Sequence, residues 1–186
     1  MGELASTGQL RMAFARRALF TVPLIVVLGF VAGAVSNNGD NNLWYALLKK
    51  PSFQPPSWAF PVAWTTLYVL LGLALAKVLN ARGSERRSSA VLLFAIQFAL
   101  NLAWSPVFFA LHRPTWAFVV LALMIAFAIA TTRAFWRIRT SAGLLMLPYL
   151  AWLCFAGALN WQIVRLNPDA DTLVVPQSGT QIEIKR

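Results

Sequence analysis

Five long stretches without a charged residue or histidine most constrain how this chain can fold. They lie at 18–39, 51–76, 88–111, 114–132 and 140–164, and each is at least 19 residues long. A helix needs roughly 20 apolar residues to cross a hydrocarbon core of ~30 Å. The alternation typical of membrane β-barrel strands is not sustained anywhere in the sequence. The sequence therefore predicts an all-α integral membrane protein, a bundle of five transmembrane helices.

The composition excludes ordinary soluble folds. Charged residues make up 12% of the chain and apolar residues 59%, whereas a typical soluble domain has about 25% charged residues. So few charges could not cover such an apolar interior in water. The same composition excludes intrinsic disorder, because disordered chains have low hydrophobicity.

The charge-free stretches also divide the chain. We expect a cytoplasmic segment at 1–17, a membrane domain at 18–166 and a polar, loosely ordered tail at 167–186. The five expected spans of the membrane domain are 18–37, 57–79, 88–111, 114–133 and 141–165. The long first loop is expected at 37–57.

The remaining charges predict the orientation of the spans. With five spans, the N-terminus, the second loop and the fourth loop share one side. That side holds two Glu and ten Lys or Arg: Glu3, Glu85, Arg11, Arg16, Arg17, Lys77, Arg82, Arg86, Arg87, Arg133, Arg137 and Arg139. The other side holds four carboxylates and six Lys or Arg: Asp40, Asp169, Asp171, Glu183, Lys49, Lys50, Arg113, Arg165, Lys185 and Arg186. The positive-inside rule predicts a cytoplasmic N-terminus in a bacterial inner membrane. Topology thus explains the net charge of +10, and we expect no nucleic-acid partner.

The first span also has features of a cleavable signal peptide. Arg16 and Arg17 precede an apolar run, and the small residues at 32–34 imitate a cleavage site. The apolar run is longer than that of a usual signal peptide, and cleavage would leave four spans and upset the charge distribution. We therefore favour a retained first span.

The loop at 37–57 combines turn residues, aromatic residues and prolines. SNNGDNN is typical of turns, and residues 43–48 could form a short interfacial helix with Trp44 and Tyr45 at headgroup depth. Three prolines stiffen the stretch that follows: Pro51, Pro55 and Pro56. Such a loop could cap a cavity at one end of the bundle or anchor the chain at the membrane surface, and spacing alone does not decide between these.

Polar and aromatic residues fall on one face of the second, third and fifth expected helices. They recur at three- or four-residue steps: Trp64 and Tyr68, then Gln97, Asn101 and Trp104, then Trp152, Ala156 and Asn160. Because amides are costly in lipid, we expect these faces to point inward. If they converge, they enclose an aromatic cavity suited to a large, planar, mostly apolar ligand. The alternative is that the Trp rings only pack helices together and the amides bond between helices.

Small residues predict close helix contacts. Gly72 and Ala76 continue the face of Trp64 and Tyr68 as a smooth strip. Two further sets suit helix packing or a dimer contact: Gly29 and Gly33, and Ala95, Ala99 and Ala103.

Most catalytic chemistries lack their residues. No carboxylate lies inside a span, which removes the usual membrane proton relay. His112 is the one histidine and Cys154 the one cysteine, too few for a metal site. The sequence contains no glycine-rich phosphate loop and no hydrolase elbow. We therefore expect no metal and no required cofactor.

Three segments resemble the TspO/translocator protein family, also called the peripheral-type benzodiazepine receptor family. They are WYALLKKPSFQPPSWAFPVAWTTLY at 44–68, QFALNLAWSPVFF at 97–109 and LPYLAWLCFAGALN at 147–160. The resemblance implies a five-helix bundle in the lipid membrane, commonly a homodimer. It implies binding of porphyrins such as protoporphyrin IX, of sterols and of benzodiazepine-type ligands in a cavity under the first loop.

The resemblance also assigns residues. Trp64 and Trp152 match tryptophans implicated in porphyrin binding and in light- and oxygen-dependent porphyrin breakdown. Ala156 matches a position where small-residue changes alter the ligand response. Together with the helical spacing, the resemblance gives the predicted ligand-binding set: Tyr45, Trp64, Tyr68, Asn101, Trp104, Trp152, Ala156 and Asn160.

A sterol-associated motif of the family, Leu/Val then Tyr then Lys/Arg, corresponds here to Leu159, Trp161 and Arg165. Trp replaces Tyr, so the hydroxyl is absent. Such motifs are weak patterns even when complete.

Three functions follow as hypotheses. The favoured one is a receptor or transport-like protein that senses tetrapyrroles, with Trp and Tyr rings on the macrocycle and Lys49 and Lys50 near its propionates. The second is a porphyrin-degrading enzyme that uses Trp64 and Trp152 with light and oxygen. The third is a membrane scaffold. Because relatives have been placed in outer membranes, an outer-membrane location remains the alternative to the inner one.

Overall fold

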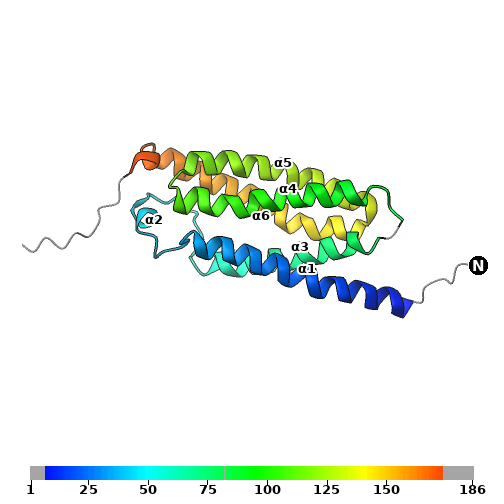
Figure 1. Cartoon of the computed structure of the whole chain (residues 1–186). Coiled ribbons are helices and arrows are strands. Elements are labelled where there is room, and N and C mark those ends of the chain that lie inside the picture. Colours follow the sequence, from blue (N-terminus) through cyan, green and yellow to red (C-terminus); the bar gives the residue numbers. More distant parts are fainter. Residues whose placement is uncertain (1–6, 82, 174–186) are drawn as a thin grey trace, which may run out of the picture.

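The computed structural model describes residues 7–81 and 83–173 (Figure 1). Its elements are α1 (Thr7–Val35), α2 (Leu43–Leu47), α3 (Ala59–Leu79), α4 (Arg87–Ser105), the π-helix η1 (Pro106–Ala110), α5 (Pro114–Ile138), α6 (Thr140–Leu166) and the 3₁₀-helix η2 (Ala170–Thr172). Over these residues there is no strand, and five helical segments are long and apolar enough to cross a membrane: α1, α3, α4 with η1, α5 and α6. The predicted all-α bundle of five spans is confirmed.

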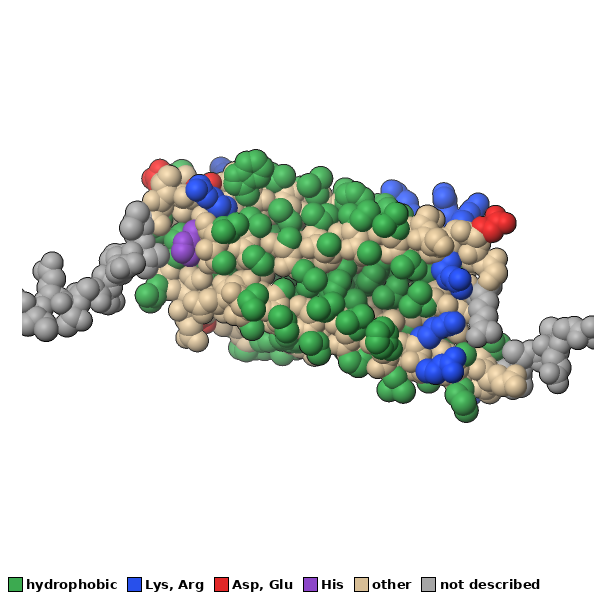
Figure 2. Space-filling model, viewed as in Figure 1, with side chains coloured by type: hydrophobic (Ala, Val, Ile, Leu, Met, Phe, Trp, Pro, Cys, Tyr) green, Lys and Arg blue, Asp and Glu red, His purple; other side chains and the backbone are tan. Residues whose placement is uncertain are grey.

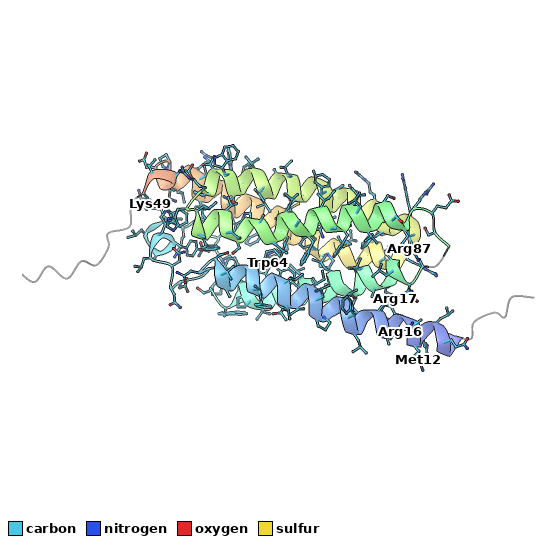
Figure 3. The ribbon with its side chains drawn as sticks, in the orientation of Figure 1. Met12, Arg16, Arg17, Lys49, Trp64 and Arg87 are labelled. Carbon is cyan, nitrogen blue, oxygen red and sulfur yellow. The ribbon has the colours of Figure 1, made fainter. Side chains whose placement is uncertain are left out.

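The long helices form one bundle with an apolar middle and charged ends. α5 packs along α4 and α6, while α3 packs against α1 and α6. On the face seen in Figure 2, hydrophobic side chains cover the middle, and Lys and Arg gather mainly at one end. Arg16, Arg17 and Arg87 lie at that end, and Lys49 lies at the other (Figure 3). The ends of the bundle thus carry the charge difference that the positive-inside rule uses.

The first helix is longer than the expected first span. α1 begins at Thr7, whereas the charge-free stretch begins at residue 18. Missing charges mark the part of a helix that lipid can surround, and a helix can continue past that part into water. Arg17 uses this extension: its guanidinium donates to the carbonyl of Leu79 and to Asn80 Oδ1 (2.8 Å) at the end of α3. A cation at a helix C-terminus is electrostatically favourable.

The smooth strip on α3 is the surface on which α1 lies. A Cβ atom on Gly72 would stand 2.6 Å from the Val22 Cα atom, so this glycine permits close backbone approach. Thr21 Oγ1 donates to the Gly72 carbonyl across the contact (2.8 Å). Further along the same contact between α1 and α3, a Cβ on Gly29 would overlap the ring of Tyr68. The glycines of α1 and α3 therefore bring these helices together and leave room for a ring at the cavity.

The alanine face of α4 lies on the outside of the bundle formed by the described residues. Ala95, Ala99 and Ala103 are exposed, while Gln97 and Asn101 on the polar face are buried. Of the two uses that the sequence left open, packing between helices of one chain is therefore wrong for these alanines.

The tail is partly packed, contrary to the expectation that 167–186 is loosely ordered. Asn167 Nδ2 donates to the carbonyl of Lys49 (2.9 Å), and the Lys49 N–H donates to Asn167 Oδ1 (2.8 Å). Ala170 is buried. Residues up to 173 thus belong to the folded bundle, and the rest of the expected tail, like the first six residues of the expected segment 1–17, lies outside the described residues.

Replacing Gly72 by Ala should destabilise the protein. The added methyl meets the α1 backbone, and overpacking of this kind costs about 1–3 kcal/mol, which outweighs the ~1 kcal/mol that Ala gains over Gly in a helix. Thermal unfolding in neutral detergent would measure the change. Gly157→Ala is the matched control, because its Cβ would make only an ordinary 3.7 Å contact. Equal stability of the two variants would contradict the close packing of α1 on α3.

Candidate ligand-binding cavity

A cavity of about 450 Å³ lies inside the bundle at the end that carries the first loop. Pockets of ~300–1,000 Å³ enclose drug-sized ligands. All eight residues of the predicted ligand-binding set line this cavity: Tyr45, Trp64, Tyr68, Asn101, Trp104, Trp152, Ala156 and Asn160. They come from α2, α3, α4 and α6, and α1 closes the remaining side through residues such as Gly29 and Phe30. The structure thus brings the set together, and ligand binding by it remains a prediction.

Aromatic rings form a continuous wall of the cavity. The Trp64 and Tyr68 rings stack with their centroids 5.2 Å apart, and Trp152 meets Trp64 edge-to-face at 6.3 Å. Phe60, which the sequence did not single out, meets Trp152 at 6.0 Å. Figure 3 shows Trp64 inside the bundle, between its charged ends. Flat apolar faces of this kind suit an aromatic ligand.

The buried amides mostly bond between helices. Asn101 Oδ1 accepts from the Tyr68 hydroxyl (3.0 Å), and Asn101 Nδ2 lies 3.2 Å from the Tyr149 hydroxyl oxygen, to which it donates. Asn160 Oδ1 accepts from Trp104 Nε1 (3.3 Å), and Asn160 Nδ2 donates to a backbone carbonyl of α5 (3.0 Å). The expectation that the amides bond between helices is therefore correct for Asn101 and Asn160, and the structure also contains the cavity. These groups fix the wall and have few bonds left for a ligand.

Gln97 does not reach the cavity, although it shares the polar face of α4. Its side chain is completely buried, and neither amide atom has a hydrogen-bond partner in the part of the chain that the structure describes. Ser105 lines the cavity, and its Oγ is also buried without a hydrogen-bond partner among the described residues.

The first loop caps the cavity and is itself buried. Trp44 and Tyr45 are 1% and 7% exposed, so their rings pack inside the protein and do not face the membrane surface. Trp44 stacks on His112 (4.7 Å between centroids) and donates from Nε1 to the carbonyl of Ala170 (3.2 Å). Burial lowers the pKa of His112, so its imidazole is neutral near pH 7. The cap interpretation of the loop is thus favoured over the surface anchor.

Asn42 holds the first loop in place through hydrogen bonds at both ends of its side-chain amide. Its Oδ1 accepts from the Tyr45 N–H (3.0 Å) and so caps the N-terminus of α2. Its Nδ2 donates to the carbonyls of Asn37 and Phe109, which ties the loop to η1. An Asn before a short apolar run is a recognisable helix start, but its contact with η1 depends on tertiary structure.

The expected sterol motif does not form one surface. Leu159 lines the cavity, whereas Trp161 is 49% exposed on the outside of the bundle and Arg165 is exposed as well. Trp161 packs there on Phe118, with 5.3 Å between ring centroids. Positions two and six residues after Leu159 fall on a different face of α6, which explains the separation.

Several mouth residues were missed by sequence reasoning. Asp40, Gln54 and Ser57 line the cavity from the two halves of the first loop. Ser57 Oγ donates to Asp40 Oδ2, which joins the beginning of the loop to its end. Polar residues in a loop look like ordinary turn chemistry, so nothing in their spacing marks them as cavity residues.

An outer groove adjoins the cavity. It runs between α3 and α6 and is lined by Pro55, Ala63, Thr66, Leu67, Pro148, Ala151, Trp152 and Phe155. Trp152 and Phe155 line both the groove and the cavity, so their side chains form the partition between the two.

Comparison with known proteins agrees with this architecture. The profile of the TspO/MBR family matches residues 21–166. The chain is 41% identical over 148 residues to "Tryptophan-rich protein TspO" of Chlorobaculum tepidum, covering 79% of this chain and 93% of that protein. It is 44% identical over 124 residues to "Tryptophan-rich sensory protein" of Cereibacter sphaeroides (67% and 77%). It is 39% identical over 146 residues to "Translocator protein" of Bos taurus (77% and 86%).

Replacing Asn101 by Leu removes the hydrogen bonds with Tyr68 and Tyr149. Each interhelical hydrogen bond in a membrane contributes ~0.6 kcal/mol on average and up to ~1.7 kcal/mol, so we expect the bundle to be destabilised by about 1–3 kcal/mol. Tyr149→Phe removes one hydroxyl of the same network. A double-mutant cycle of these two changes, followed by unfolding in detergent, should show that the second change costs less once the first is made. Strict additivity would contradict a shared network.

Proposed function

Because this chain belongs to the TspO/MBR family, we propose that it binds porphyrins such as protoporphyrin IX, and benzodiazepine-type ligands, in the cavity under its first loop. The chain is a multi-pass integral membrane protein. We propose a sensing or transport-like role in tetrapyrrole regulation. One relative is named a sensory protein and another a translocator protein, which agrees with this class of role.

The aromatic wall is the observation that carries the proposal. Trp64, Tyr68 and Trp152 are in mutual or successive contact and present ring surface to one cavity. A planar macrocycle gains both apolar burial and ring contacts there. The hydrogen bonds of Asn101 and Asn160 hold the helices behind these rings, so the wall exists before a ligand arrives. Pre-organisation of this kind lowers the entropic cost of binding.

Porphyrin titration followed in the Soret band tests the proposal. The double variant Trp64→Phe, Trp152→Phe should weaken binding by about tenfold, which corresponds to ~1.4 kcal/mol, because two large rings at the ligand become smaller. Trp161→Phe is the matched control, since Trp161 lies outside the bundle. Equal affinities for the wild type, the double variant and the control would remove this cavity as the porphyrin site.

A second candidate function is porphyrin breakdown. Trp64 and Trp152 would lie beside a bound macrocycle, and their rings are oxidisable when a photoexcited porphyrin and oxygen are present. This chemistry requires no acid–base residue, and the cavity offers little acid–base chemistry.

Illumination of the complex with oxygen tests this second candidate. We expect one discrete open-chain tetrapyrrole product from the wild type and loss of that product in Trp64→Phe, Trp152→Phe at equal porphyrin loading. Bleaching at the rate of a porphyrin bound to an unrelated protein, without a discrete product, would reject it.

We also propose that the protein forms a homodimer, with Ala95, Ala99 and Ala103 as the contact. These small residues are exposed on the lipid-facing side of α4 and permit close helix approach. Sterol binding receives less support, because Leu159 and Trp161 occupy different surfaces.

A further inference from the structure

The electrostatic character of the cavity mouth is set by one carboxylate. Among the described residues that line the cavity, Asp40 is the one side chain that carries a charge at neutral pH. The lining includes no Lys, Arg or His over the same residues. The interior is otherwise aromatic and aliphatic, so few other charges compete with Asp40 for control of the local potential.

Asp40 is positioned by the turn that follows α1. Gly39 precedes it with φ +101°, a conformation that a side chain disfavours. Ser57, just before α3, donates to Asp40 Oδ2, and no second donor to the carboxylate lies within the described residues. The carboxylate is exposed and keeps acceptor capacity on its other oxygen.

The two lysines expected to meet propionates stand outside the cavity. Lys49 and Lys50 are exposed, and neither lines it. Lys50 Nζ lies 4.4 Å from the centroid of the Tyr45 ring, and the backbone of Lys49 is bound to Asn167. The Lys50 ammonium thus lies against the ring of a lining residue, whereas the Asp40 side chain lines the cavity itself.

Two further observations agree with an acceptor-rich mouth. Burial raises the pKa of Tyr45, a hydrogen bond with the Gln54 side chain opposes this shift, and the negative charge of Asp40 adds to it. The field of Asp40 therefore reaches the tyrosine at the cavity wall. Gln54 Oε1 is buried without a donor in the described chain, and a buried acceptor without a partner is costly, so a donor on a ligand would be favourable there.

We propose that Asp40 and Gln54 form an acceptor site at the cavity mouth, which selects planar aromatic ligands that carry an ammonium or other donor group over matched ligands that carry carboxylates. The inference deepens the proposed function, because it concerns the same cavity and names the preferred ligand charge. It differs from the expectation that the mouth welcomes propionates through lysines. Asp40 is a specificity residue in this scheme, and it takes no part in any reaction.

Three porphyrins with one macrocycle test the charge preference. They are protoporphyrin IX, its neutral dimethyl ester and its diamide with ethylenediamine, which carries two ammonium groups. We expect affinity to rise from the dianionic to the neutral to the cationic ligand, measured in neutral maltoside micelles with empty-micelle blanks. Asp40→Asn should weaken the cationic ligand about three- to fivefold, the effect of one exposed ion pair, and leave the neutral ligand unchanged. The preference should shrink as salt rises.

Matched variants isolate the site from general charge. Asp169→Asn removes one exposed carboxylate at the same end of the bundle, away from the cavity lining, and should change none of the three affinities. Gln54→Met should weaken the cationic ligand more than the neutral one. Lys50→Gln should leave the order of the three ligands intact. Equal preference in Asp40→Asn and the wild type, or loss of the preference in Asp169→Asn, would overturn the inference.

A non-porphyrin pair separates this inference from the proposed function. A cationic aminoacridine and an acridine carboxylate can be followed by quenching of tryptophan fluorescence. If porphyrins do not bind but the aminoacridine is preferred in an Asp40-dependent way, the porphyrin function fails and the acceptor site stands. If porphyrins bind without charge preference, the function stands and the acceptor site fails. If neither class binds, both fail.

Discussion

The hydrogen-bond network around Asn101 is the interaction on which the rest of this structure depends. In a bilayer interior, polar groups without a partner are costly, and water is not at hand to supply one. Asn101 of α4 joins Tyr68 of α3 and Tyr149 of α6, and the Tyr149 hydroxyl also contacts Met124 of α5. One side chain thereby fixes four helices relative to one another. The open space above this network is the cavity, and its walls keep their spacing because the network sets the distance between the helices.

The cavity is completed by chain segments that are distant in the sequence. The first loop crosses the end of the bundle, and Asn42 holds it to η1. Asn167, after α6, holds the same loop from the other side through paired hydrogen bonds with Lys49. The first loop is thus attached both to η1 and to the segment that follows α6. A ligand under it would be enclosed by elements whose contacts span 67 and 118 positions in sequence.

Much of the fold and the wall of the site could be predicted from the sequence, and the mouth could not. Missing charges identify spans because lipid excludes charge, and four-residue spacing places Trp64 beside Tyr68 and Trp152 near Ala156 whatever the tertiary structure. The burial of Trp44 was not predicted, because the sequence near the end of a span looks the same for a Trp at the membrane surface and for a Trp packed inside the protein. Asp40 and Asn167 were missed because their roles depend on contacts with distant segments. Lys49 and Lys50 come shortly after Trp44 and Tyr45 in the sequence, but the turn of the chain after α2 leaves them outside the cavity.

We expect a planar tetrapyrrole to bind in the cavity against the Trp64 and Trp152 rings while the helix network stays intact. An experimental structure of the protein with protoporphyrin IX in a lipid environment tests this most directly. We expect the macrocycle inside the bundle, in contact with both Trp rings and beneath the first loop, with Asn101 still bonded to Tyr68 and Tyr149. A macrocycle in the outer groove between α3 and α6, on the lipid side of Trp152, would contradict the claim.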